Sequence, residues 1–153
     1  MPMLRTAIVI ISLSLFFTSI CHASVKGKKC TKEEAIEAEN EIDRLNDWDS
    51  IYSSFKRFAH CDDGAISEGY SDVVGHLLAE DWKNLLKLLR LTASDIQFKR
   101  FVIKHLDETI PNTVAMKIHG NVNKSCSAEA KQLCKLIECQ LTIAAELAEP
   151  APL

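Results

Sequence analysis

Helix-capping residues recur ahead of apolar residues spaced three and four apart, from residue 31 to residue 147. This spacing places the apolar side chains on one side of an α-helix, which must then pack against another element. No stretch alternates apolar and polar residues for long enough to predict a strand. The sequence therefore predicts an all-α fold, a compact bundle or array of about six to seven antiparallel helices.

Capping residues and helix-stopping residues set the predicted boundaries. Thr31, with a Glu three residues later at capping-box spacing, opens a helix that runs to about Leu45. Gly120 and Asn121 are expected to end the sixth helix, and the last and longest helix runs to about Leu147. The later helices are expected to begin at Asp47 or Asp49, at Asp62 or Asp63, at Asp81, at Thr92 or Ser94, at Pro111, and at Ser125 or Ser127.

The first 23 residues have the order of a secretory signal peptide. Arg5 supplies positive charge, residues 6–20 are uncharged and mostly apolar, and Cys21 and Ala23 fit cleavage after Ala23. A membrane anchor is the alternative, but the stretch is shorter than the ~20 apolar residues that cross a bilayer. We expect a signal peptide at 1–23, a single helical domain at 24–149 and a disordered tail at 150–153. The location is then periplasmic or secreted, without stable membrane insertion.

Cleavage removes one of the six cysteines, and an exported chain meets oxidising conditions that favour disulfides. The odd number that remains leaves one thiol either free or paired between two chains, so a homodimer stays open. Cys126 precedes the last helix and Cys134 lies two turns inside it, so we expect a Cys126–Cys134 bond. For Cys30 we expect a bond to Cys61, with Cys139 as the alternative partner. One or two disulfides are therefore predicted.

The densest polar group is His60-Cys61-Asp62-Asp63-Gly64, with Glu68 one helical turn later. An imidazole beside carboxylates can bind a metal or act as acid and base, so a metal-binding or hydrolytic site at His60, Asp62 and Glu68 is one interpretation. The adjacent Asp residues lack calcium-loop spacing, and one of them is explained as a helix cap. We predict instead that Asp62, Asp63 and Glu68 contact a partner protein, and we expect no metal or cofactor.

The formal net charge is −3, and it becomes −4 when the leader leaves with its Arg5. A mildly acidic chain is not expected to bind nucleic acid or anionic lipid, which select basic surfaces. Recognised catalytic motifs are missing from the sequence, so no catalytic residue is assigned. His105 is expected to pack its ring at the end of the fifth helix.

These observations predict a non-catalytic binding or inhibitor protein that acts on a protein partner. Two other classes remain as alternatives. One is the metal-binding or hydrolytic enzyme described above. The other is a small-molecule carrier, which would need an apolar cavity between helices.

At His60-Cys61-Asp62-Asp63-Gly64-Ala65-Ile66, at Phe101-Val102 ahead of His105-Leu106-Asp107, and at Cys126 and Cys134, the chain resembles uncharacterised exported helical proteins of Gram-negative bacteria. The likeness covers about Trp48 to Glu138 and implies no function. In size, helicity, export and cysteine use, the chain is also similar to periplasmic immunity proteins that block peptidoglycan-cutting effectors of type VI secretion. This analogy implies an immunity protein that neutralises a secreted effector, and it rests on no shared motif.

Overall fold

Helices make up 79% of residues 28–148, the part of the chain that the computed structural model describes, and no strand occurs among these residues. The predicted all-α class is confirmed. The predicted signal peptide at 1–23 and tail at 150–153 lie outside the described residues. The described α-helices are α1 (Lys32–Ile42), α2 (Trp48–Phe58), α3 (Gly64–Glu80), α4 (Leu85–Ser94), α5 (Ile96–Lys104), α6 (Asn112–Ser125) and α7 (Lys131–Ala148), with 3-10 turns η1 (Ala59–Cys61) and η2 (Trp82–Asn84).

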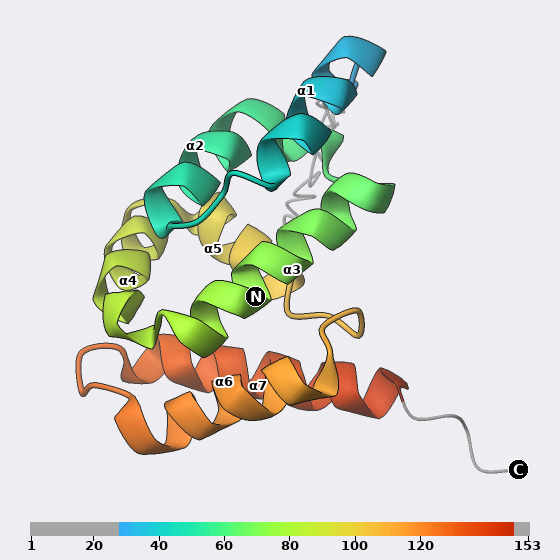
Figure 1. Ribbon diagram of the computed structural model, residues 1–153. Helices are drawn as coiled ribbons and strands as arrows, with labels where there is room; N and C mark the ends of the chain where they lie inside the picture. The colour runs from blue at the N-terminus through green and yellow to red at the C-terminus, as the bar shows by residue number, and fades with distance from the viewer. Residues whose placement is uncertain (1–27, 149–153) are drawn as a thin grey trace, which may run out of the picture.

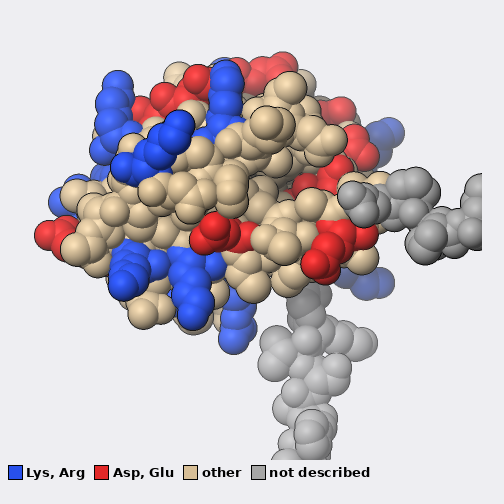
Figure 2. All heavy atoms as spheres, turned by 90° about the horizontal axis from the view of Figure 1, so that it is seen from below, with Lys and Arg blue, Asp and Glu red and all other residues tan. Residues whose placement is uncertain are grey.

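The central element of the arrangement is α3, which packs against α1 on one side and α6 on the other (Figure 1). The helices α1 and α2 run antiparallel, and α6 and α7 form a second antiparallel hairpin below them. Contacts between α5 and α7 join this hairpin to the rest of the fold. Figure 2 looks onto the hairpin from below, where uncharged surface lies between groups of basic and acidic side chains.

Aromatic rings fill the centre of the core, where α2, α3 and α5 meet. The ring centroid of Phe101 lies 4.9 Å from that of Tyr70 and 5.0 Å from that of Phe55. Burying an aromatic side chain of this kind stabilises a fold by about 1.5–3 kcal/mol, so these contacts hold the three helices together. The largest fully buried apolar side chains are Trp48, Tyr70, Phe98, Ile51, Leu78, Leu88, Leu106, Ile118 and Ile137.

The first three α-helices begin at predicted caps. Thr31 Oγ1 accepts a hydrogen bond from Glu34 N at 3.2 Å, and the Glu34 carboxylate accepts one from Thr31 N at 3.1 Å. Asp47 starts α2 by accepting from Ser50 N at 2.7 Å. Asp63 starts α3 by accepting from the next backbone N–H at 2.9 Å. A side chain that satisfies an unpaired N–H in the first turn is a local device, which explains why sequence spacing finds it.

The predicted start of α5 at Thr92 or Ser94 is wrong. Asp95 is the cap, and its carboxylate accepts from the N–H groups two and three residues later, at 2.9 and 3.1 Å. Thr92 lies inside α4, where its buried hydroxyl donates to the carbonyl of Leu88 at 2.9 Å. A threonine hydroxyl can bond back to its own helix, so it does not have to start a new one.

The predicted end of α6 at Gly120 and Asn121 is also wrong, because the helix continues to Ser125. Gly120 does not adopt the left-handed conformation that ends a helix. The Asn121 side-chain amide donates to the carbonyls of Leu78 and Ala79, each at 3.0 Å. These two carbonyls lie in the last turn of α3, so Asn121 caps the neighbouring helix and leaves its own unbroken.

The last helix begins at Lys131, later than the predicted Ser125 or Ser127. Ser127 instead closes a turn ahead of the helix, where its side-chain oxygen accepts from Ala130 N at 3.3 Å. At the other end of the chain, α1 ends at Ile42, before the predicted limit at Leu45. These two helices therefore lie in the predicted regions of the sequence, but their ends differ from the predicted residues by several positions.

Two disulfides close the fold, and both expected pairs are confirmed. Cys30–Cys61 ties the segment before α1 to η1, with a Cα–Cα distance of 4.9 Å. Cys126–Cys134 ties the α6–α7 loop to the first turns of α7. Cys139 is exposed on α7 and is bonded to no other cysteine among residues 28–148. No described helix combines the length and apolar character that crossing a membrane requires.

Candidate functional site

An open groove of about 640 Å³ lies between α1 and α3. Gly69 in the middle of α3 allows the two helices to approach, since a Cβ atom there would lie 2.6 Å from Cδ1 of Ile42. Glycine inside a helix costs about 1 kcal/mol relative to alanine, and this close contact explains its presence. The floor of the groove is apolar and includes Ile42, Leu45 and Val73.

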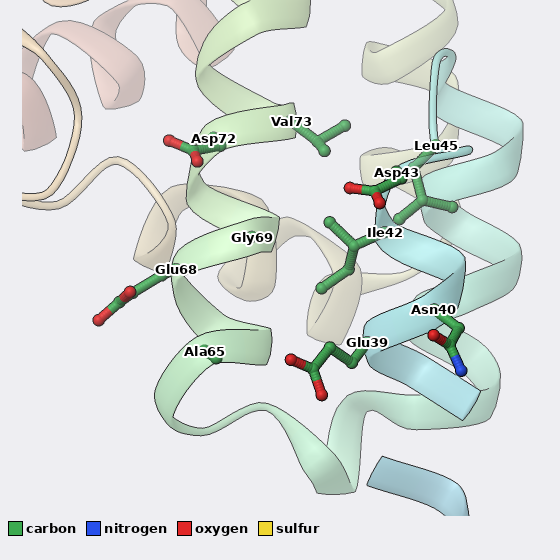
Figure 3. A pocket seen from close by; sticks show the side chains of 10 residues that line it. All are labelled: Glu39, Asn40, Ile42, Asp43, Leu45, Ala65, Glu68, Gly69, Asp72 and Val73. Atoms are coloured by element: carbon green, nitrogen blue, oxygen red, sulfur yellow. The ribbon is translucent and has the colours of Figure 1, made fainter. Parts of the chain in front are cut away.

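Four exposed carboxylates lie along this groove, two on the side of α1 and two on the outer flank of α3. Glu39 and Asp43 come from the C-terminal part of α1 and its cap, and Glu68 and Asp72 come from α3. In Figure 3 the carboxylates of Glu39 and Asp43 point from α1 toward α3, while those of Glu68 and Asp72 project from the opposite flank of α3. No ion pair within residues 28–148 involves any of the four. We call these four residues and the floor between them the acidic groove.

The structure places the three predicted contact residues in different surroundings. Glu68 lies on the acidic groove. Asp63 is exposed at the N-terminus of α3, where it serves as the cap. Asp62 turns inward, and its side chain is only 9% exposed. Asp62 is therefore held by its own chain, and of the three only Glu68 belongs to the groove.

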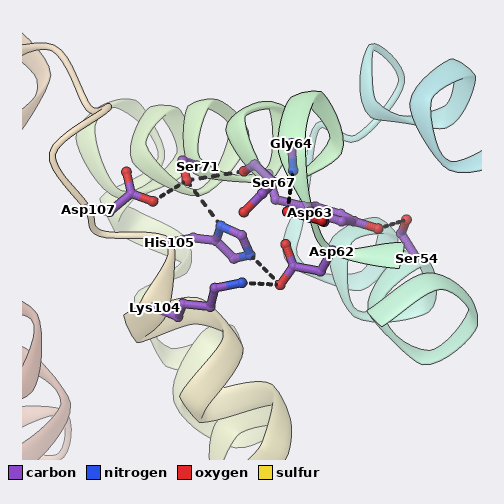
Figure 4. Close-up of polar contacts among 10 residues, drawn as sticks. Ser54, Asp62, Asp63, Gly64, Ser67, Ser71, Lys104, His105 and Asp107 are labelled. Carbon is purple, nitrogen blue, oxygen red and sulfur yellow. Dashed lines mark hydrogen bonds and ion pairs between the residues drawn. The ribbon is translucent and has the colours of Figure 1, made fainter. Parts of the chain in front are cut away.

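A buried polar network receives Asp62 and crosses from η1 to α3 and α5 (Figure 4). His105, at the C-terminal cap of α5, is 0% exposed and lies with Nε2 at 3.3 Å from Asp62 Oδ2 and Nδ1 at 3.0 Å from Ser71 Oγ. Lys104 Nζ donates to the same Asp62 oxygen at 2.8 Å, and Ser71 donates to Asp107 at 3.0 Å. The rings of Tyr70 and Phe101 pack on His105, as expected for a histidine at a helix end.

The electrostatics of this network favour ionised carboxylates. Burial acts to raise the pKa of Asp62, but hydrogen bonds from His105 and Lys104 outweigh it and lower the pKa from 3.8 to about 2. Burial also acts to raise the pKa of Asp107, and bonds from Thr109 and Ser71 again produce a net lowering. Asp62 and Asp107 therefore stay negative at neutral pH and hold His105 between them, one directly and the other through Ser71.

Ser71, His105 and Asp62 follow the spatial order of nucleophile, base and acid in hydrolytic triads. Ser71 and His105 are both 0% exposed, so a substrate cannot reach Ser71 Oγ in this conformation. The network instead joins the beginning of α3 to the end of α5, and it fixes the α3 flank of the acidic groove. Sequence reasoning missed Ser71 and Asp107. The available signal was a serine on the apolar face of α3, next to Tyr70.

The residues proposed for a metal or hydrolytic site do not come together. His60 Nε2 lies 3.2 Å from Glu34 Oε2, whereas Asp62 faces His105 and Glu68 lies on the groove. The one group of metal-type ligands among the described residues is Glu34, His60 and Cys61. The Cys61 sulfur of this group is bonded to Cys30, so the oxidised chain offers two ligands there, whereas a closed zinc site needs four.

A small-molecule carrier would need an enclosed apolar cavity. The acidic groove is open and edged by carboxylates, which suits a cationic partner better than an apolar ligand. Comparison of the chain with protein-family models, with curated proteins and with solved structures gave no match.

Proposed function

We propose that this protein is an exported, non-catalytic binding protein that holds a basic segment of a partner protein in the acidic groove. The observation that carries the proposal is the acidic lining of one groove: Glu39 and Asp43 point toward α3, Glu68 and Asp72 lie on the outer flank of α3, and none of the four has an ion pair inside the described chain. Lysine and arginine match this surface, because their heads pair with carboxylates while their stems lie on apolar atoms. In its most specific form the protein is an immunity protein and the partner is a secreted effector.

The spacing of these carboxylates supports a role in binding. Glu39 and Asp43 are four residues apart, and so are Glu68 and Asp72, so each pair shares one side of its helix. Like charges at this spacing destabilise a helix by a few tenths of a kcal/mol. The two pairs therefore do not serve helix stability. A bound cationic segment would reduce the repulsion between the two carboxylates of each pair. Its attraction to them would also raise the association rate at low salt.

A rigid frame fits the inhibitor role. The Cys30–Cys61 bond holds the segment before α1 against η1, and the His105 network holds the start of α3. Both walls of the groove are thereby fixed before a partner arrives. A preorganised surface loses less conformational entropy on binding, so it reaches higher affinity from the same contacts.

The test is affinity capture with the oxidised protein as bait, from extracts of the source organism, followed by mass spectrometry and a direct titration of the captured partner. We expect the variant with Glu39→Lys and Asp43→Lys to lose at least about tenfold in affinity, because the two reversed charges repel a basic segment. Raising the salt concentration should weaken the affinity of the wild type for the partner. The affinity of the charge-reversed variant should change little with salt.

The matched control carries Glu108→Lys and Glu129→Lys, which changes the net charge by the same amount at exposed positions outside the groove. It should bind as the wild type does. Equal loss in both variants would mean that net charge, and not the groove, attracts the partner. Full affinity in the groove variant would disprove the site assignment, whatever partner is captured.

A further inference from the structure

The outer face of α7 carries an apolar stripe that nothing in the described chain covers. Leu136, Ile143 and Leu147 are 43%, 44% and 70% exposed, at helical spacings of seven and four residues. Cys139 is exposed and lies between the first two, three residues after one and four before the other. The opposite face of α7 is the one that packs into the core, with Leu133, Cys134, Ile137, Leu141 and Ala144 buried. Four adjacent apolar or weakly polar side chains on a solvent face mark a contact surface.

Charge along α7 differs between its two ends. The exposed cations Lys131 and Lys135 lie at the N-terminal end and the exposed anion Glu146 lies near the C-terminal end, while Glu138 lies beside Cys139 at the middle, with its Oε1 3.7 Å from Nδ1 of His119 on α6. In Figure 2 basic side chains lie at the lower left of this face, and acidic side chains lie at its centre and to the right. A second copy of the same helix, placed antiparallel, brings its acidic end beside this basic end. The surface is thus complementary to itself under twofold symmetry, which is the symmetry of most protein dimers.

The position of Cys139 agrees with the same arrangement. In an antiparallel pair centred on this residue, Lys131 lies eight residues before the axis and Glu146 of the second copy seven after it, so their positions along the helix differ by about 1.5 Å. Helices packed with axes about 8–10 Å apart place facing Cα atoms roughly 3.5–5.5 Å apart, which overlaps the disulfide range of about 4.4–6.8 Å. A twofold symmetry axis that passes beside Cys139 therefore brings the two Cys139 thiols into bonding distance.

We infer that the outer face of α7 binds a second copy of this chain, antiparallel, and that a Cys139–Cys139 disulfide can lock the pair. One helix face is smaller than the ~800 Å² per partner of a stable interface, so the contact alone gives a weak dimer. The covalent step joins the two Sγ atoms and releases two protons and two electrons. A disulfide oxidant such as oxidised glutathione accepts them and leaves as two thiols.

The experiment measures the mass of the full chain by light scattering over a range of concentrations, with both internal disulfides intact, before and after incubation with oxidised glutathione. We expect a concentration-dependent dimer before this incubation. After oxidation we expect a covalent dimer at twice the monomer mass, with Cys139 as the cross-linked peptide. Cys139→Ser should keep the reversible dimer and lose the covalent one. A wild type that stays monomeric throughout, with Cys139 free or capped by glutathione, would overturn the inference.

Surface variants separate this face from any other. Leu136→Asp with Ile143→Asp should be monomeric, while Met116→Asp, at an apolar position on α6 that is 74% exposed, should dimerise as the wild type does. Circular dichroism confirms that each variant is folded. A dimer that survives the α7 changes would place the contact elsewhere and refute the proposal.

A charge exchange tests the antiparallel arrangement. Glu146→Lys alone should weaken the reversible dimer about three- to tenfold, because it faces the two lysines of the other copy. Adding Lys131→Glu and Lys135→Glu to that variant should restore the affinity. Failure to restore it would exclude the antiparallel alignment.

Discussion

Replacing Asp62 with Asn tests whether the buried network holds α3 and α5 together. The substitution keeps the size of the side chain and one acceptor oxygen but removes the negative charge that faces His105 Nε2 at 3.3 Å and Lys104 Nζ at 2.8 Å. Two positive or hydrogen-bond-donating groups then lose their counter-charge in a place where the Asp62 side chain is only 9% exposed. The loss of stability should follow from that burial.

The lowered pKa of Asp62 sets the magnitude. A change from 3.8 to about 2 means that folding favours the ionised form by about 2 kcal/mol. Because the pKa in the folded protein lies below the pKa in the unfolded chain, this stabilisation is fully present above about pH 5. It is lost as the pH falls through the folded value, and less than about 0.5 kcal/mol should remain near pH 2.

Urea unfolding, followed by far-ultraviolet circular dichroism at a series of pH values, measures this difference. We expect Asp62→Asn to lower the free energy of unfolding by about 2 kcal/mol at pH 7, and the gap from the wild type to close between about pH 5 and pH 2. Other carboxylates with lowered pKa values that lie outside this network, such as Glu80 and Asp95, cancel in the subtraction. Glu68→Gln, an exposed control, should change stability by no more than ~0.5 kcal/mol. A loss below ~0.5 kcal/mol for Asp62→Asn, or a gap that does not depend on pH, would refute the reasoning.

Two further predictions concern packing and cross-linking. Gly69→Ala should destabilise the fold by about 1–2 kcal/mol, because its Cβ meets Ile42, while Gly120→Ala should stabilise it by up to ~1 kcal/mol, because nothing lies within 4 Å of its Cβ. Thermal unfolding compares them, and a shift of the same sign in both would contradict the packing argument. Replacing Cys30 and Cys61 together by Ser should cost about 3.5 kcal/mol, since that bond spans 31 residues, against about 2.5 kcal/mol for the other disulfide, which spans 8. Urea unfolding of the two double variants measures both losses of stability. A larger loss for the disulfide that closes the shorter loop would contradict the prediction.

The devices that sequence reasoning found correctly act over short distances. Thr31 and Glu34 form a capping box within one turn, and Cys126 reaches Cys134 across one short loop. Spacing alone reveals such partners, because a helix fixes where a residue three or four positions away must lie. The four carboxylates of the acidic groove also follow a local pattern, because Glu39 with Asp43 and Glu68 with Asp72 are like charges four residues apart. Only Glu68 is among the contact residues that the sequence predicts.

Residues whose partners come from distant elements were assigned wrongly or incompletely. Asn121 has the composition signal of a helix end, but its amide caps α3, 42 and 43 residues earlier. Asp62 has the signal of a cap or a surface charge, but it faces His105, 43 residues later. In both cases the polar side chain forms its hydrogen bonds with a distant segment of the chain and not with its own helix or turn. A buried polar group must find a partner, and the packing decides which one is within reach.

The sequence by itself determined the helical class, the places where most helices begin and the Cys126–Cys134 pair, because these depend on periodicity, local hydrogen bonds and the closure of a short loop, whereas it left Cys30 with two possible partners. The tertiary structure decided which faces of α1 and α3 meet over Gly69, which carboxylates lie along the groove between them, and which face of α7 has no contact with the described chain. Those outcomes depend on the relative placement of helices. That placement results from the simultaneous packing of many side chains far apart in the chain, and no local pattern encodes it.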